Sequence, residues 1–463
     1  MIPAEFIKRL ASQKYIDSEA LVKSLNESSP VSFRINPFKW NHEPLEAAKV
    51  SWSENGYYLE KRPSFTFDPL FHSGCYYPQE ASSMFIEQVF KQLINIKDQL
   101  RVLDLCAAPG GKSTHLSTLI GKNGLLVANE VIRSRANILT ETLTKWGIGN
   151  ALVTQNDPAD FSRLEGYFDV ILVDAPCSGE GMFRDEVARN NWSEANANLC
   201  AERQKRILGD VWSALKENGT LIYCTCTFNP FENEKIIEWL VENKRAEIIL
   251  PNISEFSGIT PIDCNGVKGY SFFPYKTKGE GFFCSVLRKN EETKPVKIGK
   301  VKITESKPTD KEKDLIKSLL LDSDTNLLKN ANEIWALPCG YSDYNLLSQN
   351  LRIIKSGIKV ATIKKNDAIP SHDLALSTNM LKNEFCEIEL NYEEAISFLK
   401  RDALNISAPK RDWIILKYKG VNLGWVKNIG SRINNYYPVE WRIRMNTSNA
   451  NKSNIIKWKD NDQ

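Results

Sequence analysis

The chain has 463 residues, of which 42% are hydrophobic and 25% charged, a composition typical of globular proteins and a length sufficient for about three domains. It contains no apolar run of about 18 residues, which excludes a membrane-spanning helix, and Glu5, Lys8 and Arg9 interrupt the stretch where a secretory signal would be apolar. Ten cysteines without a C-x-x-C pair, with only four histidines, favour neither a disulfide framework nor a zinc site. We therefore expect a cytoplasmic monomer with reduced thiols, no metal and no membrane contact.

Charge is distributed unevenly along the chain. The net charge is +3, but residues 400–463 hold thirteen Lys and Arg against five Asp and Glu. The same stretch contains five large aromatic residues: Trp413, Trp425, Tyr436, Tyr437 and Trp441. A basic module with aromatic rings is typical of proteins that follow a nucleic-acid backbone and stack on bases. The alternative, a small basic β-domain whose aromatic residues form its core, remains open from composition alone.

The N-terminal part begins with short helical patterns at 4–12 and 18–25 and an alternating strand at 31–36, and a longer apolar helix is expected at 79–94. A central block then alternates strands and helices. The expected strands are 101–106, 125–130, 151–155, 168–174, 220–226 and 246–250, and the expected helices are 112–120, 133–146, 197–216 and 231–242. Such alternation predicts an α/β fold with an open, mainly parallel, doubly wound sheet.

The C-terminal half has weaker patterns. Residues 270–275 and 281–289 look like a closing hairpin, and 290–313 is rich in Lys, Glu, Thr and Pro, as expected of a linker. The predicted divisions are an N-terminal α+β domain at 1–78, the α/β domain at 79–289, the linker at 290–313, an intermediate domain at 314–390 and a β-rich basic module at 391–463.

A small-residue loop follows the first strand of the central block. Asp104-Leu-Cys-Ala-Ala-Pro-Gly-Gly-Lys-Ser113 ends that strand and opens a helix. Its glycines allow close approach of a ligand, and the helix N-terminus favours a carboxylate or phosphate. The loop is not a Walker A motif, because Cys106 stands where that motif has its first glycine, and it is not G-x-G-x-x-G.

Three acidic residues follow strands of the predicted sheet. Glu130 ends the second strand, about twenty residues after Gly110, where nucleotide-binding folds place an acid on the ribose hydroxyls. Asp157 and Asp174 follow the third and fourth strands. Because ligands bind at the carboxyl ends of parallel strands, the set predicts a nucleoside site.

Two cysteines also follow strands. Cys177 lies in Asp174-Ala-Pro-Cys-Ser-Gly179, and Cys226 lies in Thr225-Cys-Thr227. The fourth and fifth strands of such sheets are often neighbours, so we expect both thiols to face one crevice. Cys224, within the fifth strand, is interpreted as a packing residue, as are Cys75, Cys200, Cys264, Cys284, Cys339 and Cys386.

These three segments resemble motifs I, IV and VI of the RNA cytosine-C5 methyltransferase family, and Phe228-Asn-Pro-Phe-Glu-Asn-Glu234 extends the last of them in the family manner. The resemblance covers roughly residues 1–289. The segment 423–438 resembles the PUA-like RNA-binding module of the small-subunit rRNA methyltransferase F branch. The resemblance implies a Rossmann-like S-adenosylmethionine-dependent methyltransferase that makes 5-methylcytidine, with 16S rRNA or the small ribosomal subunit as its partner.

The resemblance also implies roles for particular residues. Cys226 would attack C6 of cytosine, Cys177 would help to release the adduct, and Asp174 would bind the N3 edge of the base beside the methyl donor. Glu130 would hold the ribose of the cofactor and Asp157 would lie near its adenine. The remaining cofactor contacts would come from the loop residues Cys106, Ala107, Ala108, Pro109, Gly110, Gly111 and Lys112.

Two alternatives remain. In a DNA cytosine methyltransferase the cysteine of motif IV is the nucleophile, so in that case Cys177 and not Cys226 would attack the base. A non-catalytic RNA-binding factor for ribosome assembly could keep the scaffold without the reaction. The paired thiols and the basic tail argue against the DNA enzyme, and the retention of both thiols and of every strand-end acid argues against a non-catalytic factor.

Overall fold

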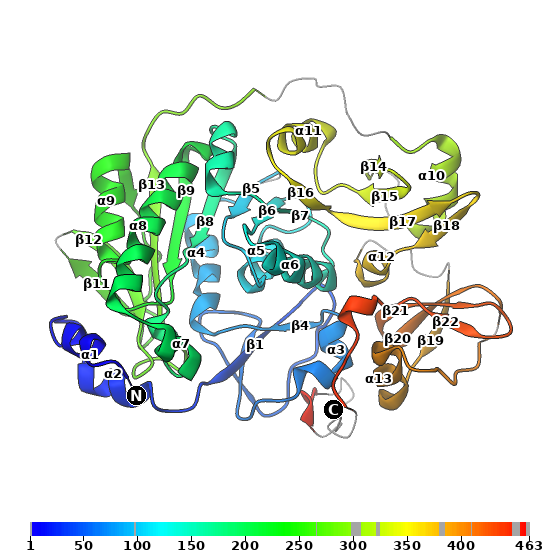
Figure 1. The fold of residues 1–463 in the computed structure, drawn as a ribbon, viewed down its shortest axis with the longest axis horizontal. Coiled ribbons are helices and arrows are strands. Elements are labelled where there is room, and N and C mark those ends of the chain that lie inside the picture. Colours follow the sequence, from blue (N-terminus) through cyan, green and yellow to red (C-terminus); the bar gives the residue numbers. More distant parts are fainter. Residues whose placement is uncertain are drawn as a thin grey trace.

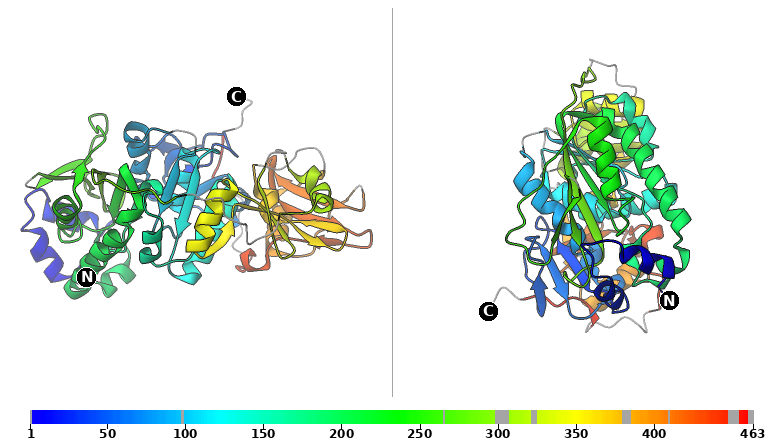
Figure 2. Two further views of the ribbon diagram at one scale, coloured as in Figure 1. Left: turned by 90° about the horizontal axis from the view of Figure 1, so that it is seen from above. Right: turned by 90° about the vertical axis from the view of Figure 1, so that its left-hand side faces the viewer.

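The computed structural model describes residues 2–96, 99–264, 266–297, 307–320, 325–378, 385–408, 410–446 and 454–459. The molecule is elongated, with a large central sheet towards one end and two smaller C-terminal sheets towards the other (Figures 1 and 2). Residues 298–306 of the predicted linker lie outside the described residues.

The central sheet has ten strands, nine of them in the order β11-β12-β13-β9-β8-β5-β6-β7-β16, while β10 pairs with β13. The five middle strands are parallel: β5 (Arg101–Asp104), β6 (Leu125–Asn129), β7 (Ala151–Thr154), β8 (Phe168–Asp174) and β9 (Leu215–Thr225). The others join antiparallel at the two sides: β10 (Ala246–Ile248), β11 (Thr260–Cys264), β12 (Val267–Phe272), β13 (Phe282–Lys289) and β16 (Ile353–Ser356). The predicted parallel centre is confirmed, and β8 and β9 are neighbours.

Helices cover both faces of this sheet (Figure 1). One face packs against α4 (Ile86–Leu93), α5 (Gly111–Leu119) and α6 (Arg133–Trp146), and the other against α8 (Glu194–Val211), α9 (Glu234–Lys244) and α11 (Tyr341–Asn350). Because the middle strands are buried on both sides, they are mainly apolar, as in β6, where Leu-Leu-Val-Ala precedes Asn129. The arrangement is the doubly wound fold that the alternation of patterns predicts.

The N-terminal part forms a four-stranded sheet in the order β2-β3-β1-β4. Its elements are α1 (Ala4–Leu10), α2 (Ser18–Ser24), β1 (Val31–Ile35), β2 (Ala47–Lys49), β3 (Gly56–Leu59), α3 (Pro69–His72) and β4 (Tyr76–Pro78). The helix expected at 79–94 begins later, with a 3-10 turn at Ser82–Phe85 before α4. Glu80 explains the delay, because its carboxylate accepts hydrogen bonds from the backbone N–H groups of Ser82 and Ser83 (both 2.9 Å), as an N-cap does.

The C-terminal half contains two further four-stranded sheets. The first comprises β14 (Leu327–Asn330), β15 (Glu333–Ala336), β17 (Ile358–Lys364) and β18 (Asp367–Pro370), and the second β19 (Cys386–Glu389), β20 (Trp413–Tyr418), β21 (Val421–Asn428) and β22 (Ile433–Asn435). Their helices are α10 (Asp310–Ile316), α12 (His372–Leu376) and α13 (Tyr392–Lys400).

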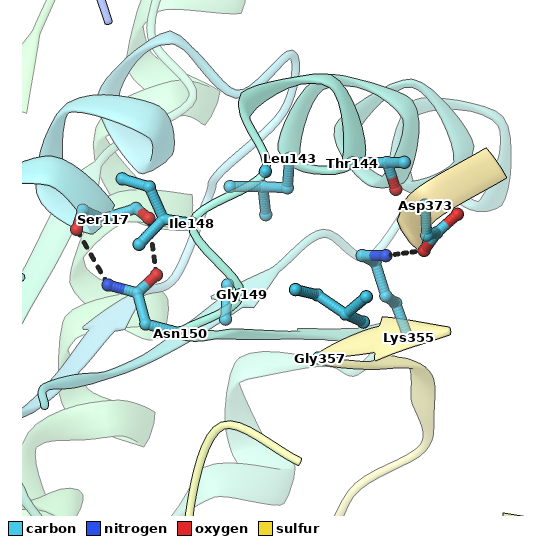
Figure 3. Close-up of a pocket in the computed structure, with 12 residues that line it drawn as sticks. Ser117, Leu143, Thr144, Ile148, Gly149, Asn150, Lys355, Gly357 and Asp373 are labelled. Atoms are coloured by element: carbon cyan, nitrogen blue, oxygen red, sulfur yellow. Dashed lines mark hydrogen bonds and ion pairs between the residues drawn. The ribbon is translucent and has the colours of Figure 1, made fainter. Parts of the chain in front are cut away.

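The segment predicted as an intermediate domain also enters the central sheet, because β16 pairs antiparallel with β7. A small cavity lies at this junction, where Lys355 of β16 forms an ion pair with Asp373 of α12 and Asn150 bonds to Ser117 (Figure 3). Each of these two pairs lies on one side of the junction. The junction itself is crossed by the strand ladder and by backbone hydrogen bonds from Gly357 to Ala151 (3.1 Å) and from Thr378 to Gly147 (3.0 Å).

The two ends of the chain share one hydrophobic core. Phe33, Tyr76 and Trp458 are buried together with residues of α13 and β20, and His72 lies 3.1 Å from the Tyr437 hydroxyl. Of the tail aromatics, Trp413, Trp425 and Tyr437 are buried core residues, while Tyr436 and Trp441 keep exposed surface. The domain limits drawn from sequence remain predictions, but the terminal parts do not pack separately.

Candidate active site

The loops that follow β5, β8 and β9 meet at the carboxyl edge of the parallel strands. β5 leads into the small-residue loop, β8 ends at Asp174, and β9 ends immediately before Cys226. Asp174 pairs in register with Cys224, so the two cysteine-bearing loops leave adjacent strands at the same level. The crevice expected from the sequence is therefore formed.

The two thiols are in contact. The Sγ atoms of Cys177 and Cys226 are 3.1 Å apart, and the backbone N–H of Cys226 donates to Cys177 Sγ at 3.3 Å. The hydrogen bond with Cys226, together with burial, raises the pKa of the Cys177 thiol well above its ordinary value. In this arrangement Cys177 is held in its protonated form, which suits a group that donates or relays a proton.

A buried carboxylate ties the two loops together. Glu232 accepts hydrogen bonds from the Ser178 backbone N–H at 2.8 Å and its hydroxyl at 2.5 Å, and also from Asn229 Nδ2 at 3.1 Å and Gln204 Nε2 at 3.2 Å. Burial raises the pKa of Glu232, and these donors offset the cost of burying its charge. The segment 228–234 thus fixes the loop that carries Cys177 against the loop that carries Cys226.

The N-terminal helices cover these loops from outside. Arg9 of α1 forms an ion pair with Glu180 (2.6 Å), whose side chain is fully buried, and Glu180 also accepts the backbone N–H of Phe228 at 3.3 Å. Phe6 of α1 packs with Phe183 and Phe228 in one cluster. The sequence gives no sign of this contact, because ion pairs between distant segments leave no periodic pattern.

The loop after β5 has a backbone conformation and close side-chain contacts that require glycine. Gly110 has φ +113°, and a Cβ there would lie 2.8 Å from Thr142 Cγ2, so only glycine fits without strain. A Cβ on Gly111 would approach the Tyr77 ring to 3.1 Å. The loop is thereby kept open in front of the N-terminus of α5.

Asp104, the last residue of β5, has a buried carboxylate at the start of this loop, and the sequence analysis did not single it out. Its Oδ2 accepts the Ser113 hydroxyl at 2.6 Å, while its buried Oδ1 has no hydrogen-bond partner among the described residues. Burial raises the pKa of Asp104 to about 7. An unpaired buried acceptor of this kind is suited to a cationic or N–H donor group of a ligand.

Lys112 and Asp174 form an ion pair across the crevice, with Nζ and Oδ2 2.8 Å apart. Burial opposes the charge of Lys112, but Asp174 outweighs it and raises the pKa of the lysine. Both residues line a cleft of about 200 Å³. Its other lining residues are Tyr77, Pro78, Gln79, Glu80, Ser83, Cys106, Ala107, Ala108, Pro109 and Gly111.

One wall of the cleft therefore comes from the N-terminal part, and the sequence analysis missed it. Arg34 of β1 supports this wall, because its guanidinium donates to Gln79 Oε1 at 2.9 Å and Thr114 Oγ1 at 2.7 Å. The guanidinium also lies over the Trp146 ring, 4.5 Å from its centroid. The only local signal is a polar and aromatic run at 77–83 ahead of an apolar helix.

The two remaining predicted residues lie outside the lining of this cleft. Glu130 is buried, accepts the Ile132 N–H at 2.9 Å and pairs with Arg135 at 3.4 Å, and Arg135 donates to the carbonyl of Ala108 at 2.8 Å. Asp157 is more exposed and pairs with Arg206 of α8 at 3.2 Å. Glu130 is thus linked to the loop after β5, whereas Asp157 faces α8.

Comparison with known proteins matches this geometry to one family. The model for "16S rRNA methyltransferase RsmB/F" matches residues 91–288, that for the N-terminal domain of 16S rRNA methyltransferase RsmF matches 2–81, and that for the methyltransferase RsmF PUA domain matches 378–443. Ribosomal RNA small subunit methyltransferase F of Klebsiella pneumoniae is 33% identical over 427 residues, covering 88% of this chain and 86% of the relative. The chain belongs to the RsmB/F family.

Other relatives agree with this membership. The methyltransferase F of Escherichia coli O157:H7 is 30% identical over 455 residues and covers 93% of this chain and 91% of its own. Among solved structures, a methyltransferase homologue from Pyrococcus horikoshii is 26% identical with a TM-score of 0.51, covering 62% of this chain and 100% of its own. NSun6 from the same organism, solved with SFG, shares the fold at 19% identity and a TM-score of 0.51, covering 62% of this chain and 97% of its own.

Membership of the RsmB/F family confirms the expected fold and enzyme class. The protein is an RNA methyltransferase whose methyl donor is S-adenosylmethionine, and it carries a PUA domain at its C-terminal end. Within the described ranges, no group of three or more His, Cys, Asp or Glu side chains is arranged to hold a metal ion. No helix in the described part of the chain is both long and apolar enough to cross a membrane.

Proposed function

We propose that this protein methylates C5 of cytidine in 16S rRNA, with Cys226 as the nucleophile and Cys177 as the group that helps to release the product. The observation that carries the proposal is the contact of the two thiols beside the Lys112–Asp174 pair. Cytosine C5 is a weak carbon nucleophile, and addition of a thiolate at C6 converts the ring into an enamine that reacts at C5. The names of the relatives support 16S rRNA as the substrate. The same proposal places the protein in the cytoplasm, acting as a monomer on rRNA or the small subunit.

Three residues have separate roles in the proposed reaction. Cys226 Sγ forms the bond to C6, and Asp174 hydrogen-bonds the N3 edge of the base and stabilises its protonated form. After methylation the C5 proton must leave before the C6–S bond can break with its electron pair returning to Cys226. Once Cys226 is bonded to C6, its sulfur no longer forms the hydrogen bond that raises the pKa of Cys177 in the free protein. Cys177 can then release its own proton to solvent and, as a thiolate, accept the C5 proton.

The residues around the cleft suit S-adenosylmethionine, whose amino-acid end has an ammonium and a carboxylate. Asp104 offers an unpaired buried oxygen for a cationic donor, and Lys112 at the start of α5 offers a cation for the carboxylate. Glu130 is proposed to hold the ribose and Asp157 the adenine end. When bound, S-adenosylmethionine supplies the electrophilic methyl group.

The test is methylation of defined substrates followed by mapping of the product. A 16S rRNA transcript, purified small subunits and a double-stranded DNA of matched sequence are each incubated with the protein and S-adenosylmethionine, and 5-methylcytidine is identified by mass spectrometry and bisulfite sequencing. We expect product in one or both RNA substrates and none in DNA. Product in DNA alone would favour the DNA-type enzyme, and no product in any substrate would favour an assembly factor.

A further inference from the structure

A second pocket lies on the opposite side of Tyr77 from the cleft. It has a volume of about 210 Å³ and is lined by side chains from three elements, namely α3, β4 and α6. Phe71 and Tyr77 provide partly exposed aromatic surface, Tyr76 and Trp146 are buried beneath it, and Ile138 of α6 is 51% exposed. None of the catalytic or cofactor residues proposed above lines it.

A charged pair gives this pocket polar recognition groups. Lys145 Nζ lies 2.6 Å from Glu141 Oε1. The same ammonium lies 5.2 Å from the centroid of the Phe71 ring and 5.5 Å from that of Trp441, which follows β22 in the C-terminal module. The carboxylate accepts hydrogen bonds, as from the amino groups of bases, and the ammonium suits an acceptor or a phosphate.

The pocket is linked to the methylation site by two contacts. The Tyr77 ring lines both the pocket and the cleft that holds Lys112 and Asp174. Thr142 lines the pocket and donates its hydroxyl to the carbonyl of Pro109, at 2.8 Å, in the loop after β5. A ligand in the pocket would therefore lie next to the groups that hold the donor and the target base.

We propose that this pocket binds an unpaired nucleobase of the RNA substrate other than the target cytosine. Sequence-specific recognition of RNA commonly uses bases that are turned out of a strand, stacked on aromatic rings and hydrogen-bonded at their edges. Phe71, Ile138 and Tyr77 supply the apolar and aromatic surface, and Glu141 supplies the acceptor. Exposed Arg442 and Arg444 follow Trp441 in the chain and offer positive charge to the adjoining backbone. The proposal rests on RNA being the substrate.

The first test changes the exposed wall of the pocket. Ile138→Ser removes apolar surface and Ile138→Trp fills the mouth of the pocket. Both changes leave in place Arg135 and Thr142, whose side chains bond to the loop after β5. We expect both variants to weaken binding of a 16S rRNA transcript at least fivefold, the lower end of the effect of losing one stacked base. Affinity for S-adenosylmethionine, measured by calorimetry, should not change.

Ile96→Ser is the matched control. Ile96 is 49% exposed, but it lies before β5, at the amino ends of the parallel strands and hence opposite the active site. The Ile96→Ser variant should bind the transcript with the affinity of the wild-type protein. Thermal unfolding of all three variants verifies that they are folded. If both Ile138 variants bind the transcript like Ile96→Ser, the pocket is not a nucleobase site.

The second test locates the base directly. Transcripts that carry 4-thiouridine or 6-thioguanosine are irradiated with the wild-type protein, and cross-linked peptides are identified by mass spectrometry. We expect cross-links to peptides that contain Phe71, Tyr77 or Ile138. Cross-links confined to other peptides would overturn the pocket proposal even if affinity falls. Methylation of the same transcript by the wild-type protein tests the proposed function separately, so failure of one proposal is distinguishable from failure of the other.

Discussion

The Sγ atoms of Cys177 and Cys226 lie 3.1 Å apart although the residues are 49 positions apart in the chain. Their contact follows from the pairing of β8 with β9, which brings the loops after both strands to one level. Two thiols at this distance do not ionise independently, because a second thiolate would be repelled by the first. The hydrogen bond with Cys226, together with burial, raises the pKa of the Cys177 thiol, which agrees with the proposal that Cys226 and not Cys177 is the nucleophile.

The first prediction concerns the nucleoside end of the cofactor site. Glu130→Ala and Asp157→Ala should each weaken S-adenosylmethionine binding by about 1–3 kcal/mol, because polar groups of the ligand lose their partners. RNA affinity should remain close to that of the wild-type protein. Calorimetry for the cofactor and filter binding for RNA provide the measurements.

Asp157 needs a separate control because it also pairs with Arg206. Arg206→Met removes that ion pair and keeps the carboxylate. We expect this variant to retain its affinity for S-adenosylmethionine. Equal losses in Asp157→Ala and Arg206→Met would assign the effect to the ion pair and remove Asp157 from the cofactor site.

The second prediction concerns the pH dependence of stability without cofactor. Burial raises the pKa of Asp104 from 3.8 to about 7, so between about pH 4 and 7 the folded protein keeps a proton that the unfolded chain releases. The contribution of the Asp104 carboxyl group to the free energy of unfolding therefore falls as pH rises from about 4 to about 7, and it stays low above pH 7. Asp104→Asn removes this titration, while its amide oxygen can still accept the Ser113 hydroxyl.

Urea unfolding at pH 5 and pH 8 measures this effect. Other groups titrate in both proteins, so the informative quantity is the difference between the variant and the wild-type protein at each pH. We expect Asp104→Asn to gain stability relative to the wild type on going from pH 5 to pH 8. The same difference at both pH values would contradict the raised pKa of Asp104.

Part of this site follows directly from the sequence, because the position of a residue after a strand determines which edge of a parallel sheet it reaches. Asp174, Cys177 and Cys226 needed only the alternation of strands and helices to be placed together. The wall formed by Tyr77 and Glu80 could not be found this way. It depends on the pairing of β4 with β1 and on hydrogen bonds from distant backbone groups, which leave no local pattern.

The tail illustrates a second limit of sequence patterns. Composition alone did not decide between stacking and core roles for the aromatic residues, and the structure divides them. Trp425 and Tyr437 are fully buried, whereas Tyr436 is 37% exposed. Trp425 packs in the cluster that contains α12 and donates to the Ser371 carbonyl. Tyr437 packs against Phe398 of α13 and His72 of α3. These contacts join segments far apart in the chain and leave no local pattern.

The third prediction concerns RNA binding by the C-terminal module. Removing the residues after Leu390 would be a poor test, because they share a core with Phe33 and Tyr76 of the N-terminal part, and the truncated chain should unfold at lower temperature. Neutralising exposed cations is cleaner. Arg442→Gln with Arg444→Gln should weaken RNA binding and lower the slope of log K against log salt by up to about 1 for each RNA phosphate that the variant no longer neutralises.

Lys122→Gln serves as the comparison for this charge effect. Lys122 is exposed after α5, near the amino end of β6, and should leave the salt slope unaltered. Slopes are measured by fluorescence anisotropy with a labelled 16S rRNA fragment. An unaltered slope in the double arginine variant would restrict these residues to a structural role.

The fourth prediction assigns the two thiols. After methyl transfer the C5 proton must leave before the Cys226 sulfur can depart, so loss of the proposed proton acceptor at Cys177 should stop the reaction with RNA still attached. Cys177→Ala should accumulate a denaturant-resistant RNA adduct when a 16S rRNA transcript and S-adenosylmethionine are supplied. Denaturing electrophoresis detects the adduct, and mass spectrometry of the digested complex identifies the attached cysteine.

The companion variants decide between the two possible nucleophiles. Cys226→Ala should form no adduct, and the double variant should behave like Cys226→Ala, because without the first bond there is nothing to release. Cys224→Ala is the matched control, since Cys224 is a fully buried thiol in β9. This variant should still form the methylated product and should accumulate no stable adduct. An adduct that persists in Cys226→Ala and disappears in Cys177→Ala would reverse the two roles and favour the DNA-type arrangement, in which the cysteine after β8 attacks the base.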